Sequence, residues 1–310
     1  MTSANDPHRS LIAVVGPGAV GGLVAAFLQK ARHDVVLVGR PGTARRVSEH
    51  GFEVVTDRFG AWHAPLRATT SVPRGARVLV AVKADGLADV AGPIAAASPP
   101  EVVSLLNGVE HMTTLRAAFR GREGGPAAGP VVVGASYAGE TLRTGSSPDT
   151  AMTVRHRGEL LRITVPAAAA DLEVVQALHD TDIEVVIAGS EAEVLWSKLR
   201  FLAPLALLTS VHRTGVGEAL DADPVLTDGV LGEVAAVASA EGVPTTQGDL
   251  RAILGGFPST MRSSLQADLA AGNVGELDAI GGAVARRGEA RSVPTPTITR
   301  VVAQLRGQIG

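Results

Sequence analysis

LIAVVGPGAVG, at positions 11–21, joins an apolar, β-branched run directly to three glycines in GxGxxG spacing. This order is typical of a strand that turns tightly into a helix, where glycines let the backbone approach a pyrophosphate at the positive end of the helix. The motif alone is a weak signal, and an ordinary glycine turn is the alternative. Because it opens a βαβ pattern, we predict a dinucleotide site formed by Gly16, Pro17, Gly18, Ala19, Val20 and Gly21.

Short β-branched runs alternate with helical stretches through the first half of the chain. This alternation predicts an α/β fold with a mostly parallel sheet, here a Rossmann-type dinucleotide-binding domain. The strand-sized runs are 11–16, 35–40, 77–83, 102–108 and 131–137. Hairpin-like segments at 152–158 and 160–166, and a strand at 182–189, are expected to add antiparallel strands to the same sheet.

After Gly189 the β-rich pattern stops, and the sequence indicates an all-helical C-terminal domain whose helices are separated by Gly and Pro. The expected helices are 191–212, 224–241, 247–256, 259–271, 275–290 and 295–306. We therefore predict a cofactor-binding Rossmann domain at residues 1–189 and a helical domain for substrate binding and catalysis at residues 190–310.

Arg40 follows the second predicted strand, where an NAD-specific site would carry Asp or Glu for the ribose 2′-hydroxyl. An arginine there can bind a 2′-phosphate through two parallel hydrogen bonds, and Arg45 and Arg46 are expected to add to the positive field. A solvated loop charge is the alternative interpretation. The pattern favours NADPH as the cofactor.

Composition narrows the partner to a small molecule. The chain has no cysteine, which excludes disulfides, thiolate catalysis and cysteine-ligated metals. A formal net charge of −3 and few aromatic residues argue against a nucleic-acid partner. The apolar runs are too short for a membrane span, and the first ten residues, MTSANDPHRS, lack the apolar core of a signal peptide. We expect a cytoplasmic protein without a membrane partner.

Lysine is scarce: only Lys30, Lys83 and Lys198 occur among 28 basic residues, and the rest are arginine. A lysine in this chain is therefore expected where a compact, titratable ammonium is needed. Lys83 and Asn107 follow predicted strands, at the sheet edge where α/β folds bind ligands. Lys198 lies on the first helix of the second domain and could protonate a carbonyl oxygen, although a surface helix charge is the alternative. The histidines show no metal-ligand spacing, so no metal site is predicted.

The chain resembles the ketopantoate reductases, also called 2-dehydropantoate 2-reductases, in the order of several motifs. These motifs are GPGAVG, VAVKA, LLNGVE, LWSKL, SSLQAD, GELDAIGGAV and VPTP. The resemblance implies hydride transfer from NADPH to a 2-oxo acid, ketopantoate above all, and a place in pantothenate biosynthesis. By position it assigns Lys198 as catalytic acid, Glu276 as its partnering carboxylate, Asn107 near substrate and cofactor, Ser264 as a substrate-binding serine, Lys83 as the strand-end lysine, and Arg40 as the 2′-phosphate ligand.

Each of these assignments has a structural alternative. Glu276 could only complement a helix dipole, Asn107 before a glycine could only form a turn, and Ser264 could be a helix-local hydroxyl. The family usually carries asparagines four and eight residues after the lysine, where this chain has Leu202 and Ala206. Pro204 between them predicts a bend.

The departure at the two substrate-facing positions leaves the substrate open. Two alternatives follow: the same scaffold acting on a more apolar oxo acid or an imine, and a sensor that binds NADPH without turnover. The presence of both Lys198 and Glu276 argues against the sensor. The sequence leaves the oligomeric state undecided, with a homodimer open.

Overall fold

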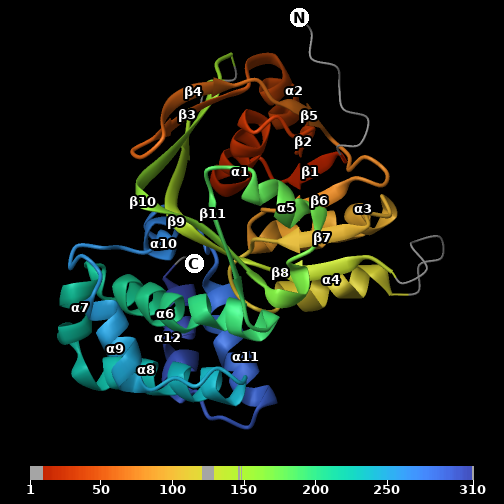
Figure 1. The fold of residues 1–310 in the computed structure, drawn as a ribbon. Coiled ribbons are helices and arrows are strands. Elements are labelled where there is room, and N and C mark those ends of the chain that lie inside the picture. Colours follow the sequence, from red (N-terminus) through yellow and green to blue (C-terminus); the bar gives the residue numbers. More distant parts are fainter. Residues whose placement is uncertain (1–9, 121–128, 146, 148, 309–310) are drawn as a thin grey trace, which may run out of the picture. The chain divides into compact units, whose positions relative to one another are not determined.

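The computed structural model describes residues 10–120, 129–145, 147 and 149–308, and its ribbon is shown in Figure 1. Residues 1–9, on which the expectation about a signal peptide rests, lie outside the described part. The chain divides into two compact units: Met1–Leu106 with His111–Glu191, and Asn107–Glu110 with Ala192–Gly310. The short segment 107–110 thus groups with the later helices.

The first unit contains a six-stranded sheet whose neighbouring strands are parallel, in the order β5-β2-β1-β6-β7-β8. Its central strands are buried apolar runs because helices cover both faces. The strands are β1 (Ile12–Val15), β2 (Val35–Val38), β5 (Arg67–Thr69), β6 (Arg77–Val80), β7 (Glu101–Ser104) and β8 (Val131–Gly134). Its helices are α1 (Ala19–Lys30), α2 (Pro41–His50), α3 (Leu87–Ala96), α4 (His111–Phe119) and α5 (Glu173–His179). The predicted Rossmann-like parallel sheet is confirmed.

A second sheet of five strands lies in the same unit, with β11-β10-β3-β4 in order and β9 paired to β10. Its strands are β3 (Phe52–Thr56), β4 (Gly60–Ala64), β9 (Ser136–Thr144), β10 (Met152–Pro166) and β11 (Glu184–Ala188). The expectation that the later strands extend the first sheet antiparallel is therefore wrong. β10 pairs antiparallel with β9 but parallel with β3 and β11.

The two segments expected to form a hairpin are one continuous strand, β10. Gly158 has a φ of +72°, and the β9–β10 register shifts between Arg157 and Arg162. The glycine therefore marks an irregularity of the ladder in place of a turn. On α1, a Cβ at Gly22 would contact Phe52 and Val154 of the second sheet at 3.1–3.2 Å. Strands on more than one side explain why α1 is buried at eight of its twelve positions.

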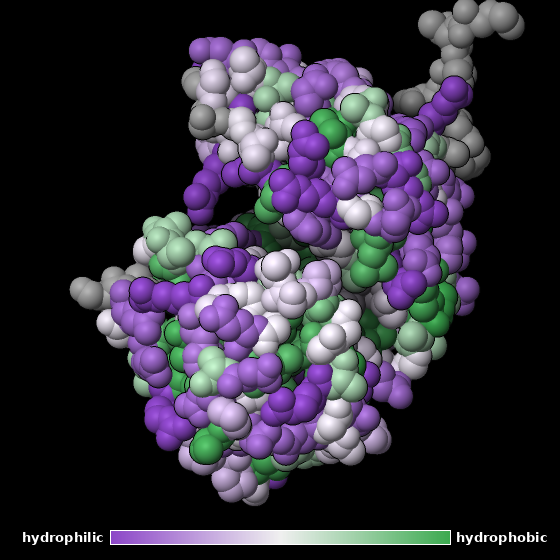
Figure 2. Space-filling view, turned by 90° about the vertical axis from the view of Figure 1, so that its left-hand side faces the viewer, coloured by the Kyte–Doolittle hydropathy of each residue, from purple (hydrophilic) through white to green (hydrophobic). Residues whose placement is uncertain are grey.

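The second unit is helical, as predicted. Its elements are α6 (Glu191–His212), α7 (Val216–Ala222), α8 (Pro224–Ala240), α9 (Gln247–Gly255), α10 (Ser264–Ala270), the π-helical segment η3 (Asp278–Gly282), α11 (Ala283–Ala290) and α12 (Pro296–Gly307). α10 begins five residues later than expected, α7 was not predicted, and the expected 275–290 helix opens with the π turn. In the face shown in Figure 2, hydrophilic residues cover most of the surface, with hydrophobic residues in scattered patches.

Helix α6 is the longest helix of the second unit among the described residues and contributes many of its core residues. It is long and apolar enough to cross a membrane by length and composition, but two thirds of the relevant window (67%) is buried in the protein. Trp196 and Leu199 belong to the hydrophobic core of this unit. The helix continues through Pro204, which is itself buried, so the predicted bend does not interrupt it.

The contact between α8 and α12 shows how small residues set helix spacing here. A Cβ at Gly229 would lie 2.7 Å from the hydroxyl oxygen of Thr297, whereas Gly232, one turn on, has only a Gln247 oxygen at 3.8 Å. The Glu233 carboxylate accepts hydrogen bonds from the backbone N–H groups of Thr297 and Ile298, both at 2.8 Å. α8 thereby both caps α12 and approaches it closely.

This arrangement predicts opposite effects for two identical substitutions in one helix. Gly232→Ala should raise the free energy of unfolding by about 1 kcal/mol, the usual gain in helix propensity. Gly229→Ala should lower it, because overpacking typically costs about 1–3 kcal/mol and exceeds that gain. Thermal and urea unfolding of both variants measures the difference; equal stabilisation by the two alanines would contradict the close helix contact.

Candidate active site

In the glycine loop between β1 and α1, neighbouring backbone atoms decide which positions have room for a side chain. Gly16 has a φ of +105°, and a Cβ there would lie 2.7 Å from the carbonyl oxygen of Ala81. A Cβ at Gly21 would clash with the carbonyl oxygen of Gly16. At Gly18, by contrast, only the Ala81 oxygen comes within 4.0 Å among the described residues. Gly16 and Gly21 are thus required by the fold, while the space over Gly18 can admit a ligand.

Arg40 lies beside this loop. A Cβ at the preceding Gly39 would lie 2.7 Å from the Pro17 ring, so the end of β2 packs on the loop. The exposed Arg40 side chain has no hydrogen bond or ion pair within the described part of the chain. A second arginine that the sequence gave no reason to select, Arg143 of β9, donates from Nη1 to the carbonyl oxygen of Pro17 at 3.0 Å.

The two other arginines near the N-terminus of α2 differ in their engagement. Arg46 donates hydrogen bonds to the carbonyl oxygens of Thr150 at 2.7 Å, Gly145 at 3.0 Å and Ala151 at 3.4 Å. Its guanidinium therefore connects α2 to the ends of β9 and β10. This structural role is additional to the positive field that the sequence led us to expect. Arg45 is exposed on the same helix.

Lys83 follows β6 and lies two residues after Ala81, which packs against Gly16. It is exposed and precedes the short 3-10 helix Ala84–Gly86. The sequence places this lysine at the C-terminal end of a strand, and in the structure it lies three residues after β6 ends.

Lys198 of α6 is partly buried, between the core residues Trp196 and Leu199 in sequence. Burial lowers the pKa of its ammonium to about 8, and the nearby Glu276 carboxylate opposes the shift by favouring the charged form. The result is a lysine that is mostly protonated at neutral pH but gives up its proton more readily than an exposed one.

Asn107 and Glu276, 169 residues apart in sequence, are joined directly. The Asn107 side-chain amide donates to Glu276 Oε2 at 2.7 Å. The next residue, Gly108, has a φ of +85°, and a Cβ there would clash with the carbonyl oxygen of Ala279. The glycine thus allows its segment to lie against the π turn that follows Glu276. Because the two side chains bind each other, Asn107 does more than form a turn, and Glu276 does more than interact with a helix dipole.

Ser264 is the first residue of α10 and is exposed. The helix is capped by its neighbour Ser263, whose hydroxyl accepts from Gln266 N–H at 3.1 Å and pairs with the Thr209 hydroxyl at 2.9 Å. Within the described residues, no hydrogen bond connects Ser264 to Lys198 or Glu276. The assignment of Ser264 as a substrate-binding serine stays a prediction.

Leu202 and Ala206 differ in how much surface they keep. Leu202 is partly buried against the core of the helical unit, one turn after Lys198. Ala206 has no exposed surface. Leu202 can therefore contact a ligand on the lysine's side of α6, whereas the structure gives Ala206 no surface for one.

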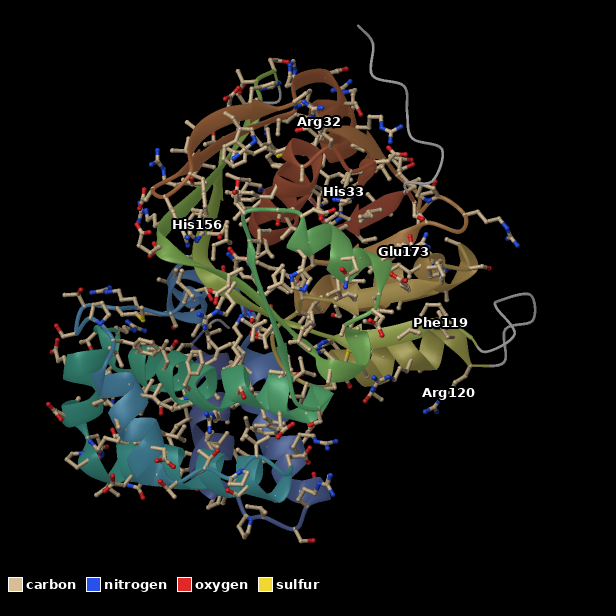
Figure 3. The ribbon with its side chains drawn as sticks, in the orientation of Figure 1. Arg32, His33, Phe119, Arg120, His156 and Glu173 are labelled. Carbon is tan, nitrogen blue, oxygen red and sulfur yellow. The ribbon has the colours of Figure 1, made fainter. Side chains whose placement is uncertain are left out.

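The histidines are dispersed. His33, labelled in Figure 3, lies 3.0 Å from Asp180, and the buried His156 of β10 shares a 2.9 Å hydrogen bond with the Leu160 carbonyl oxygen. Burial, with a contribution from Arg116, lowers the pKa of His111 to about 4. No group of three or more His, Cys, Asp or Glu side chains that could hold a metal ion occurs among the described residues.

Comparison with known proteins identifies both units. The family model described as ketopantoate reductase PanE/ApbA matches residues 12–169, and the model of its C-terminal region matches residues 192–308. A 2-dehydropantoate 2-reductase of Caulobacter vibrioides is 32% identical over 304 residues, covering 95% of this chain and 97% of the relative.

Solved structures agree on the fold. A PanE/ApbA family ketopantoate reductase from Ralstonia eutropha JMP134 has a TM-score of 0.79 at 25% identity, covering 96% of this chain and 98% of that one. D-mandelate dehydrogenase, solved with NADH and anilino(oxo)acetate, has a TM-score of 0.77 at 17% identity, covering 96% and 98%. Two family models and a relative that match nearly the whole chain leave one assignment: this chain belongs to the ketopantoate reductase family of nicotinamide-dinucleotide oxidoreductases.

Proposed function

We propose that this protein reduces a 2-oxo acid with NADPH, that ketopantoate is the leading substrate, and that Lys198 is the general acid. The observation that carries the proposal is the grouping of Lys198, Glu276 and Asn107 within one unit, where Asn107 binds the Glu276 carboxylate at 2.7 Å and that carboxylate acts on the lysine.

Residues of the first unit would hold NADPH, which when bound supplies the hydride. The open space at Gly18 and the start of α1 suit a pyrophosphate. Arg40, without a partner among the described residues, suits a 2′-phosphate, which a guanidinium can bind through two hydrogen bonds. α2, which follows Arg40, has no acidic residue in its first turn to compete for this cation.

Residues of the second unit would bind and protonate the substrate. The Lys198 ammonium donates a hydrogen bond to the carbonyl oxygen and transfers its proton as negative charge develops there. Its pKa of about 8 lies near working pH, where a general acid is most effective. Glu276 keeps the lysine charged, and Asn107 fixes the carboxylate that does so.

The apolar side chain of Leu202 supports a second candidate substrate. Leu202 replaces an amide side chain with an apolar one on the lysine's side of α6. The structurally similar D-mandelate dehydrogenase shows that this fold also occurs in an enzyme named for another acid. A more apolar oxo acid is therefore the alternative substrate. A homodimer and a cytoplasmic location stay predictions from the sequence.

The role of Arg40 gives a prediction about cofactor choice. The native protein should bind NADPH much more tightly than NADH, and Arg40→Asp should reverse that order because the carboxylate repels the 2′-phosphate. Arg45→Asp, which makes the same charge change at an exposed position of α2, the helix that follows Arg40, should change the preference far less. Calorimetry at one ionic strength measures all three; equal native affinities would show that Arg40 does not read the 2′ position.

The role of Lys198 predicts a loss of turnover without a loss of cofactor. Lys198→Ala should lower kcat by roughly 10²- to 10⁴-fold, the usual range for a positioned acid. NADPH affinity should stay nearly unchanged. Lys198→Arg should recover little activity because a guanidinium holds its proton too tightly. Lys30→Ala, which removes an exposed lysine paired with Asp182, is the control and should leave kcat intact.

The proposed role of Lys198 as general acid also determines whether kcat/KM rises or falls with pH. Because the acid must carry its proton, the kcat/KM for oxo-acid reduction should fall as pH rises through about 8, where Lys198 deprotonates. Rates that stay flat between neutral pH and well above this value, with chemistry rate-limiting, would rule out Lys198 as the proton donor.

Leu202 generates the prediction about substrate selectivity. An apolar pocket distinguishes a hydroxyl from its isostere by only about 10²-fold, against about 10⁴- to 10⁵-fold for a site built to hydrogen-bond it. The kcat/KM for ketopantoate should therefore exceed that for its deoxy analogue by less than about 100-fold. Leu202→Asn should raise this ratio, and Leu202→Met should not. A native preference of a thousandfold would place the hydroxyl on other groups, such as Asn107 or Ser264.

A further inference from the structure

Arg286 of α11 joins two acidic residues that are far apart in sequence. Its Nε lies 3.1 Å from both carboxylate oxygens of Glu110, and Nη2 donates to Glu110 Oε2 at 2.6 Å. The same guanidinium donates to Asp278 Oδ1 and Oδ2 at 3.0 Å and to the Asp278 carbonyl oxygen at 3.1 Å. Among the residues that the structure describes, the Arg306 side chain of α12 forms a hydrogen bond only with Asp278, at 3.1 Å.

Both acids adjoin the residues of the candidate site. Glu110 follows Asn107 by three residues, and Asp278 follows Glu276 by two. One guanidinium therefore links the segment that carries the amide to the segment that carries the carboxylate. Gly108, which lies between Asn107 and Glu110 in the chain, closely approaches Ala279, the residue after Asp278.

We propose that Arg286 is a positioning residue that holds the 107–110 segment against the 276–278 segment and so keeps Asn107 hydrogen-bonded to Glu276. The proposal rests on the proposed function, since the aligned carboxylate matters through Lys198. Arg286 itself touches neither Lys198 nor Glu276 in any hydrogen bond of the described residues.

The chemistry of the contact suits arginine. A planar guanidinium can form several hydrogen bonds in fixed directions, whereas a lysine ammonium acts as a single point charge. The hydrogen bonds to Glu110, and then those to Asp278, raise the pKa of Arg286 above its usual value. The Arg286 guanidinium thus stays charged at any working pH.

A purely structural ion network is the competing explanation, and it makes a different prediction. Partly exposed ion pairs usually contribute little to stability, and these side chains keep between a third and three fifths of their surface exposed. A network that matters only for stability would therefore show small, similar effects when either arginine is removed. A positioning role requires Arg286 to matter for turnover and Arg306 not to.

The kinetic test compares Arg286→Ala with its matched control, Arg306→Ala, in the full-length protein. Arg286→Ala should lower kcat for oxo-acid reduction by roughly 10- to 100-fold, the scale of a catalytic group displaced by about 1 Å. The affinity for NADPH and the melting temperature should change little, and Arg306→Ala should resemble the native enzyme. Glu110→Gln should reproduce the loss, and combining it with Arg286→Ala should add little, because both cut one connection.

A second readout does not depend on turnover. With three lysines in the chain, NMR of ¹³Cε-labelled lysine can follow the titration of Lys198 directly. Removing a positive charge by itself cannot lower the pKa of Lys198, and Arg306→Ala, which also removes one arginine from Asp278, is the control for that loss of charge. Losing the aligned Glu276 carboxylate lowers it, so Arg286→Ala should move the pKa of Lys198 below its native value.

The outcomes separate cleanly. If Arg286→Ala and Arg306→Ala match in kcat and in the Lys198 titration, the positioning role is overturned while the proposed function stands. If the native protein reduces none of the 2-oxo acids tried, the proposed function fails, and the titration still tests the alignment. A lower Lys198 pKa in Arg286→Ala alone supports the proposal.

Discussion

The hydrogen bond between the Asn107 amide and the Glu276 carboxylate, at 2.7 Å, is the constraint on which the candidate site depends. It joins the segment that follows β7 to the segment between α10 and η3, and it fixes the carboxylate that favours a charged Lys198. Two further contacts make the same connection: Gly108 against Ala279, and Glu110 to Asp278 through Arg286. Residues 107–110 belong to the helical unit because of these contacts, although they follow a strand of the other unit.

Two opposing effects act on the pKa of Lys198. Burial disfavours the ammonium and lowers its pKa, while the Glu276 carboxylate favours it, and burial is the larger effect. In the proposed role of general acid, burial would ease the release of the proton, while the carboxylate would favour the charged form that carries it. An arginine does not suit this role, because its guanidinium holds its proton too tightly.

The second sheet explains features of the first unit that a Rossmann pattern alone does not. β3 and β4 pair antiparallel, and β10 crosses to pair with β3, β9 and β11. α1 therefore packs against strands of this sheet as well as those of the parallel sheet, which is why Gly22 must be small. Arg46 and Arg143 connect the strands β9 and β10 to α2 and to the glycine loop, so this sheet also supports the residues proposed to bind the cofactor.

The sequence by itself determined the βαβ start, the parallel sheet, the helical second half and the lysine worth testing, because these follow from local periodicity and from residue scarcity. It did not determine the second sheet: β3 and β4 are short strands of five residues each, and the pairing of β10 depends on partners about 100 residues away. It placed Asn107 at the end of a predicted strand, but it gave Asn107 and Glu276 their roles only through a family resemblance, and it gave no signal for Arg286 or Arg143. Such contacts join residues distant in the chain, and only tertiary packing brings them within hydrogen-bonding distance.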